Sequence, residues 1–253
     1  MTAQIDSIAN KFFSYGYFVQ GKDTLPYRFY IPENQPNNKT YQPVSTLIFL
    51  HGSGERGNNN VSQLMHMGFW LMNAAIDNNM AVFIPQCSSN DYWSNVIKTA
   101  KKNGKTKFQF QEAGAPTIAM KLLMGLTDSL KKQPWFNPKQ VYVGGLSMGG
   151  MGTVEICKRK PDFFQAAFPI CGGGNIPNPN PKMRWWIFHG NKDKVVSIKH
   201  SRKLIRQLHF AHVTDVKLSI YSGVGHNAWD YVKLESDFWQ WLLNPSLIPS
   251  STK

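Results

Sequence analysis

Residues 140–152 read QVYVGGLSMGGMG and hold the most informative pattern in the chain. An apolar run ends at Leu146, and Ser147 then stands among glycines at the start of a segment with helical character. Glycines suit a sharp turn from a strand into a helix, because a Cβ would collide where backbone approaches backbone. The alternative is a glycine-rich turn that carries an ordinary surface serine, so the surrounding pattern must decide between the two.

Further apolar runs on both sides of this stretch predict a sheet of mostly parallel strands. They are STLIFLHG, MAVFIPQ, QAAFPICGGG, RWWIFHG and VKLSIYSG, at residues 45–52, 80–86, 165–174, 184–190 and 216–223, and an earlier strand is expected at 25–31. Runs that are apolar on both faces are typical of parallel strands covered by helices on each side. Helices are expected between them, at residues 115–132, 147–160, 197–212 and 231–243. The alternation predicts an α/β fold with a doubly wound sheet.

Length and composition fit a single globular domain over residues 1–253. Hydrophobic residues make up 42% of the chain, which is enough to bury a core and excludes a disordered protein. The 3 cysteines form neither a disulfide framework nor a zinc-ligand spacing, so we expect no metal and no cofactor. No stretch approaches the roughly 18 apolar residues that a membrane span needs.

The chain is basic, with 28 Lys and Arg against 15 Asp and Glu. The densest basic run, KTAKKNGKTK at residues 98–107, lacks helical periodicity, so we expect a solvated loop there. No nucleic-acid-binding motif accompanies the charge, and we expect no nucleic-acid partner. The first residues, MTAQIDSIANKFF, lack the pattern of a signal peptide. As written, this predicts a cytoplasmic protein, or a secreted or periplasmic one if a leader was removed.

Residues that directly follow the parallel strands are candidates for chemistry, because ligands bind at the carboxyl ends of such strands. Ser147 occupies that position at a helix N-terminus, where partial positive charge favours a developing anion. Asp193 follows the strand at 184–190, whereas Asp162 and Asp215 are expected away from this edge. His226 lies in the glycine-rich loop SGVGHNAWD after the last strand. The order Ser, Asp, His along the chain predicts nucleophile, orienting acid and base in one triad.

Backbone N–H groups are expected to stabilise an oxyanion beside this triad. One is that of Met148, and the other comes from the HGSG loop at 51–54, where we predict the N–H of Ser53. Glu55 and Arg56 are expected to brace that loop. Gln86, Trp93 and Trp229 are candidates for the substrate pocket, with ordinary packing as the alternative for the tryptophans.

Five segments together resemble one family: LIFLHGSGERGNNN at 47–60, FIPQC at 83–87, residues 137–174, WWIFHGNKDKVVS at 185–197 and YSGVGHNAWD at 221–230. They resemble α/β-hydrolase esterases of the phospholipase/carboxylesterase, or dienelactone-hydrolase-like, family. That family is similar to feruloyl and acetyl esterases and to polyhydroxybutyrate depolymerases. The resemblance runs from about residue 25 to 243 and implies the α/β-hydrolase fold and the same triad.

The resemblance implies a serine carboxylic ester hydrolase that works through an acyl-enzyme. Expected substrates are small-molecule or oligosaccharide esters, with a short acyl or aryl group, including esters derived from plant polysaccharides. The segment 96–114 holds five lysines and few large apolar residues, so it would make a poor cover for a lipid chain. Two alternatives are a serine peptidase of the prolyl-oligopeptidase type and a non-catalytic binding protein. The first usually carries an extra domain, for which 253 residues leave no room, and the second would need a broken triad.

Overall fold

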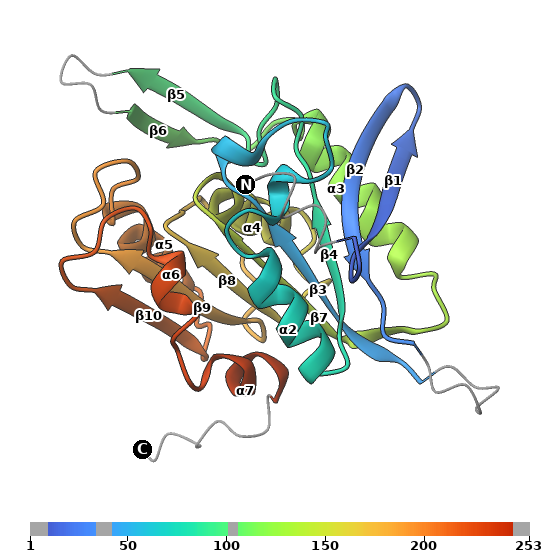
Figure 1. The fold of residues 1–253 in the computed structure, drawn as a ribbon. Helices are drawn as coiled ribbons and strands as arrows, with labels where there is room; N and C mark the ends of the chain where they lie inside the picture. The colour runs from blue at the N-terminus through green and yellow to red at the C-terminus, as the bar shows by residue number, and fades with distance from the viewer. Residues whose placement is uncertain (1–9, 34–41, 101–105, 245–253) are drawn as a thin grey trace.

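A mostly parallel sheet forms the centre of the computed structural model, which describes residues 10–33, 42–100 and 106–244 (Figure 1). Its strands, in spatial order, are β1 (Ser14–Gln20), β2 (Asp23–Tyr30), β4 (Ala81–Pro85), β3 (Val44–Leu50), β7 (Phe136–Leu146), β8 (Ala166–Ile170), β9 (Arg184–Gly190) and β10 (Val216–Tyr221). Strands β4 to β10 of this order pair in parallel, whereas β2 pairs antiparallel with both β1 and β4. This topology confirms the predicted α/β class.

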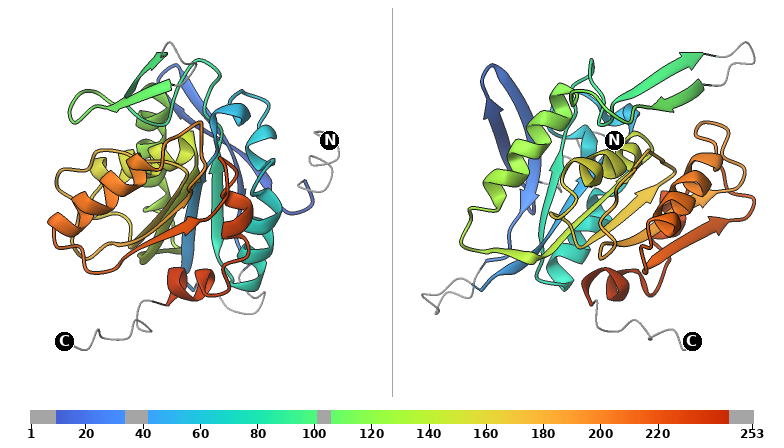
Figure 2. Two further views of the ribbon diagram at one scale, coloured as in Figure 1. Left: turned by 90° about the vertical axis from the view of Figure 1, so that its left-hand side faces the viewer. Right: turned by 180° about the vertical axis from the view of Figure 1, so that it is seen from behind.

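Helices cover both faces of the sheet (Figure 2). Residues of α3 (Ile118–Leu130), α4 (Met148–Arg159) and α5 (Lys199–Phe210) belong to one apolar core, and residues of α2 (Gly68–Asp77), α6 (Trp229–Val232) and α7 (Phe238–Leu243) belong to the other. Strands β3, β4, β8 and β9 are buried along their whole length, as expected for strands packed on both faces. Within the described residues, no helix is long and apolar enough to cross a membrane.

The basic run at 98–107 differs from the expected loop. Strands β5 (Val96–Ala100) and β6 (Thr106–Phe110) pair as a separate antiparallel ribbon, and residues 101–105 between them lie outside the described residues. The rings of Phe108 and Phe110 pack edge-on against His200 of α5, 6.1 and 5.4 Å between centroids. This contact anchors the ribbon. A loop was expected because the run lacks helical periodicity, a criterion that does not detect a strand whose aromatic residues recur at every second position.

The expected helix at 231–243 is two short helices. Helix α6 ends at Val232 and α7 begins at Phe238, with a tight turn between them. Glu235, within that turn, accepts a hydrogen bond from the Tyr221 hydroxyl at 2.7 Å. Phe238 and Trp241 then pack into the second core. This tertiary bond and the burial of the aromatic rings outweigh the local helical pattern. The sequence interpretation also missed β1 and α2.

The turn between β7 and α4 depends on close backbone contact. A Cβ on Gly149 would stand 1.9 Å from the carbonyl oxygen of Leu50 at the end of β3, and one on Gly145 would stand 2.5 Å from the backbone of Gly149. Both positions therefore require glycine, as the sequence predicted. Ser147, between them, adopts a positive φ of 54°. Such a conformation in a non-glycine residue costs on the order of 1–3 kcal/mol and persists only where its surroundings enforce it.

Candidate active site

Three side chains meet at the carboxyl edge of the sheet. Ser147 follows β7, Asp193 follows β9 and His226 follows β10. His226 Nε2 lies 2.8 Å from Ser147 Oγ, and His226 Nδ1 lies 2.7 Å from Asp193 Oδ2. We call these three residues the triad. The structure places them in one hydrogen-bonded line, although 79 residues separate the serine from the histidine in the sequence.

The carboxylate of Asp193 has no exposed surface and is surrounded by donors. Its Oδ1 accepts the backbone N–H groups of Val195 and Val196 at 2.8 and 2.9 Å. Its Oδ2 faces His226 and, at 3.2 Å, His189 Nε2. Burial alone would raise the pKa of Asp193, but the hydrogen bonds from His189, His226 and Val196 outweigh it and hold this pKa well below its usual range. The group is therefore an anion at neutral pH.

The other two aspartates lie elsewhere, as the sequence predicted. Asp215 precedes β10, at the opposite edge of the sheet, and its Oδ2 accepts from the Trp241 indole at 3.3 Å. Asp162 is exposed and accepts from the side chain of Asn180 at 3.0 Å. Within the described residues, neither aspartate forms a hydrogen bond or ion pair with His226.

The two expected oxyanion donors lie beside the serine. Met148 is the first residue of α4, where backbone N–H groups have no partner within the helix. Ser53 follows Gly52, and a Cβ on Gly52 would lie only 3.6 Å from Ser147 Cβ. The HGSG loop therefore lies against the turn between β7 and α4 that carries Ser147. Assignment of these two N–H groups to an oxyanion stays a prediction.

The loop that carries Ser53 is held by its charged neighbours. Glu55 Oε2 accepts the N–H of Gly52 at 2.7 Å. Arg56 donates from Nε to the Ser53 carbonyl at 3.0 Å and from Nη1 to the Asp91 carbonyl at 3.2 Å. These contacts agree with the expected bracing role of Glu55 and Arg56.

The prediction that Gln86 and Trp93 line the substrate pocket is wrong. Gln86 and Trp93 have no exposed surface, so neither can contact a substrate in this conformation. Gln86 instead ties the loop to β4, because its Oε1 accepts the N–H of Asn60 at 2.7 Å and its Nε2 donates to the Glu55 carbonyl at 3.1 Å. The ring of Trp93 packs edge-on against His51, 5.4 Å between centroids. Their position after a strand correctly suggested proximity to the site but said nothing about which way they face.

Trp229, the third expected pocket residue, is half-buried beside the triad. Its ring lies 5.6 Å from that of His226 and 5.1 Å from that of His66. His66 Nε2 in turn lies 3.4 Å from Glu55 Oε1. His66 was missed by the sequence interpretation, because it precedes a helix and belongs to no motif. Its hydrogen bond with Glu55 raises the pKa of His66. Burial favours protonation of Glu55, but His66 and the N–H of Gly52 outweigh it and lower the pKa of Glu55.

A family model described as phospholipase/carboxylesterase matches residues 35–236. The chain belongs to this family. A thermostable esterase of known structure is 25% identical to it, with a TM-score of 0.77 over 93% of this chain, which spans 63% of that esterase. Family membership and this likeness support the expected carboxylesterase-type serine hydrolase. None of the curated proteins compared with the chain matches it.

Two more distant structures share the fold alone. S-formylglutathione hydrolase (FrmB) from Staphylococcus aureus is 15% identical, with a TM-score of 0.63, over 92% of this chain and 98% of that one. Acylaminoacyl peptidase from Pyrococcus horikoshii is 14% identical, with a TM-score of 0.60, over 94% of this chain and 43% of that one. The α/β-hydrolase fold of this family member is thus the one expected, and a peptidase alternative gains no support from similarity of fold.

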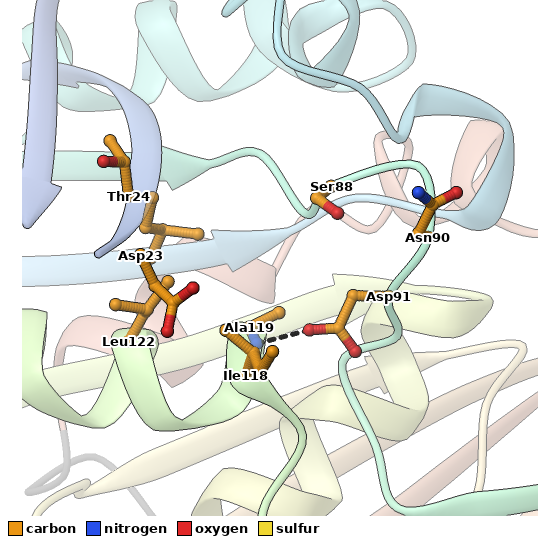
Figure 3. A pocket seen from close by; sticks show the side chains of 9 residues that line it. Asp23, Thr24, Ser88, Asn90, Asp91, Ile118, Ala119 and Leu122 are labelled. Atoms are coloured by element: carbon orange, nitrogen blue, oxygen red, sulfur yellow. Dashed lines mark hydrogen bonds between the residues drawn. The ribbon is translucent and has the colours of Figure 1, made fainter. Parts of the chain in front are cut away.

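A hollow of about 250 Å³ between β2, α3 and the loop after β4 does not include the triad (Figure 3). Asp23 on β2 and Leu122 on α3 line one side, and Ser88 and Asn90 line the other. Asp91 beside them accepts the N–H of Ala119 at 2.6 Å, so its carboxylate caps the start of α3. Arg56, next to the HGSG loop, donates to the carbonyl of Asp91 at 3.2 Å and so links that loop to the wall of the hollow.

We expect the substitution Glu55→Gln to lower the melting temperature more at pH 5.5 than at pH 9. Glutamine keeps an acceptor for the Gly52 N–H but loses the charge that faces His66. Because the pKa of His66 is raised in the folded state, this pairing stabilises the fold below about pH 6.5 and is lost as pH rises through the raised pKa. Asp77→Asn, at an exposed carboxylate on α2, is the control and should show no such difference. Equal losses at both pH values would contradict the prediction.

Proposed function

We propose that this chain is a serine hydrolase of carboxylic esters, with Ser147 as nucleophile, His226 as base and Asp193 as orienting acid. One observation carries the proposal: the line of hydrogen bonds from Ser147 Oγ through both nitrogens of His226 to the buried carboxylate of Asp193. Membership in the phospholipase/carboxylesterase family supports the reaction class.

The reaction follows from the order of these contacts. His226 Nε2 takes the Ser147 proton while Oγ attacks the ester carbonyl carbon and forms a tetrahedral intermediate. The intermediate collapses as His226 returns that proton to the alcohol oxygen, which leaves, and an acyl-enzyme remains on Ser147. Water then loses a proton to His226 and attacks the acyl carbon. Collapse of the second intermediate releases the acid and returns the proton to Ser147. Throughout, Asp193 holds the Nδ1–H of His226.

Charge that develops on the carbonyl oxygen requires donors that are already in place. The N–H groups of Met148 and Ser53 supply them in this proposal, and the N-terminus of α4 adds partial positive charge. Loss of one such donor typically costs about 3 kcal/mol in the transition state. The bracing of the HGSG loop by Glu55 and Arg56 serves this purpose, since a displaced donor stabilises little.

The substrate proposal is a short-acyl or aryl ester of a small molecule or oligosaccharide. Trp229 and His66 present two neighbouring rings next to His226, and such a surface suits a flat acyl group or a sugar ring. The segment in the place of a lid is the β5–β6 ribbon, whose described part carries Lys98 and Lys107 and few exposed apolar residues. A long acyl chain would find little apolar cover there. The resemblance to feruloyl and acetyl esterases supports including esters derived from plant polysaccharides.

We expect Ser147→Ala to abolish labelling by a fluorophosphonate probe and to lower ester turnover by several orders of magnitude. Alanine removes the attacking oxygen, and the melting temperature should change little because the hydroxyl carries no packing contact of note. Ser129→Ala on α3 is the control and should label as the wild type does. Labelling that persists in Ser147→Ala, or maps to another serine, would refute the assignment.

Asp193→Asn should lower kcat about 10⁴-fold, whereas Asp215→Asn should change it by no more than about twofold. The first variant disrupts the tautomer of His226, and the second affects only a bond to Trp241 at the opposite edge. Kinetics with p-nitrophenyl acetate and melting curves of both variants provide the measurement. Similar losses in the two variants would mean that Asp193 has no special role.

Among p-nitrophenyl esters, kcat/KM should be highest at acetate or butyrate and should fall toward palmitate, with methyl ferulate also hydrolysed. The reason is the composition of the β5–β6 ribbon, whose described part offers little exposed apolar surface to a long acyl chain. Assay of the same preparation with a chelator present serves as a control and should leave the rates unchanged. A kcat/KM that rises steadily toward palmitate would contradict the proposed pocket.

A further inference from the structure

His189 is a buried histidine that has no role in the reaction steps proposed above. It lies at the end of β9, one residue before Gly190, and it has no exposed surface. Its Nδ1 lies 2.8 Å from Ser201 Oγ. Its Nε2 lies 2.9 Å from the Val196 carbonyl oxygen and 3.2 Å from Asp193 Oδ2. Every polar atom of this ring therefore has a neighbour, in a place where an unpaired polar atom would be costly.

These neighbours decide which nitrogen of His189 carries hydrogen. Both atoms facing Nε2, a carbonyl oxygen and a carboxylate oxygen, can only accept a hydrogen bond. A bare Nε2 would face two acceptors, which is repulsive, so Nε2 must be the protonated nitrogen. Nδ1 then accepts the one hydrogen of the Ser201 hydroxyl at 2.8 Å, in place of the longer 3.3 Å contact in which that hydroxyl could donate to the Gly172 carbonyl. The surroundings thus specify the Nε2–H tautomer.

We propose that His189 is a positioning residue for the esterase reaction, which donates its Nε2–H to Asp193 Oδ2 and holds that carboxylate in place against His226. The inference rests on the proposed function, because it assumes that Asp193 orients the base. Oδ2 then receives two imidazole N–H groups, one from β9 and one from the loop after β10, while Oδ1 receives two backbone N–H groups from the following turn. With both oxygens occupied, the carboxylate cannot rotate about its terminal bond without breaking several contacts.

Two other titratable side chains, Cys171 and His200, lie around this pair. Cys171, after β8, lies within 4.8 Å of the polar atoms of His189 and Asp193. Burial first, and the charge of Asp193 in addition, raise the pKa of this thiol to about 12, so it faces the carboxylate as a neutral S–H. His200 on α5 is the next histidine, and burial and the proximity of His189 lower its pKa. Asp193 is thus the one anion in this group.

The hydrogen bond from His189 to Asp193 should also change how strongly this carboxylate stabilises the protonated form of His226. A carboxylate that shares its charge with two donors stabilises the imidazolium of His226 less than one that is free to serve it alone. Loss of the His189 donor should therefore favour protonated His226. The acid side of the activity profile would then move to higher pH, which a purely structural role for His189 would not produce.

The test compares His189→Leu with His189→Gln, assayed as full-length enzyme on p-nitrophenyl acetate from pH 5 to 9. Leucine removes the donor, whereas the Nε2 of glutamine can occupy the position of the ring Nε2–H. In His189→Leu, kcat should fall about ten- to a hundredfold with KM nearly unchanged. The midpoint of the acid side should rise by about half a pH unit or more. Glutamine should restore most of kcat and the original midpoint.

His200→Leu is the matched control, because it removes a neighbouring, half-buried histidine that forms no hydrogen bond or ion pair with Asp193 among the described residues. Its kcat should stay within about twofold of the wild type, with an unmoved pH profile. Equal kcat and pH profile in His189→Leu and wild type would overturn the inference, as would a glutamine variant no better than leucine.

A measurement on the wild-type protein keeps the inference testable if these variants fold poorly. Nitrogen-15 NMR of the histidine rings at pH 8 should show His189 with hydrogen on Nε2, and hydrogen on Nδ1 would overturn the inference. Failure of the proposed function is a separate outcome. It would appear as wild-type enzyme whose Ser147 takes no fluorophosphonate label, whatever the result for His189.

Discussion

The close approach of two backbones, at the start of α4 and the end of β3, is the constraint on which the site depends. The contact between Gly149 and the Leu50 carbonyl leaves no space for a Cβ, so the chain can turn sharply enough to place Ser147 outside the sheet edge. The same approach brings the HGSG loop, which continues from β3, against the serine. One steric condition thus places both the proposed nucleophile and a proposed oxyanion donor.

Two buried carboxylates organise the two sides of this turn. Asp193 is held by His189, His226 and two backbone N–H groups, and it faces His226, the proposed base. Glu55 is held by His66 and the Gly52 N–H, and it faces the loop. In each case burial alone would favour the neutral acid, and nearby donors reverse that preference. The site therefore combines anions with fixed donors, so little reorganisation is needed when charge develops.

Local pattern predicted the elements that lie fully within the core and failed where tertiary contacts compete. Continuous apolar runs identified β3, β4, β8 and β9, which are buried along their whole length, and the buried second half of β7. The edge strand β10 was also identified, although it is only half-buried. The helix expected at 231–243 is instead divided into two, because Glu235 accepts a hydrogen bond from Tyr221 and two aromatic side chains that follow it are buried in the core. The β5–β6 ribbon, expected as a loop, depends on rings that pack against His200, 90 residues or more along the chain.

The fold class, the need for glycine around Ser147 and the order in which Ser147, Asp193 and His226 follow their strands could all be inferred from the amino-acid sequence. These follow from sterics and from the parallel sheet, which brings all strand ends to one edge. The direction in which each neighbouring side chain faces became known from the three-dimensional structure. Tertiary packing buried Gln86 and Trp93, left Trp229 beside His226, and brought His66 to Glu55 and His189 to Asp193. A linear pattern records which residue follows a strand, but orientation and burial depend on partners that are distant in the chain.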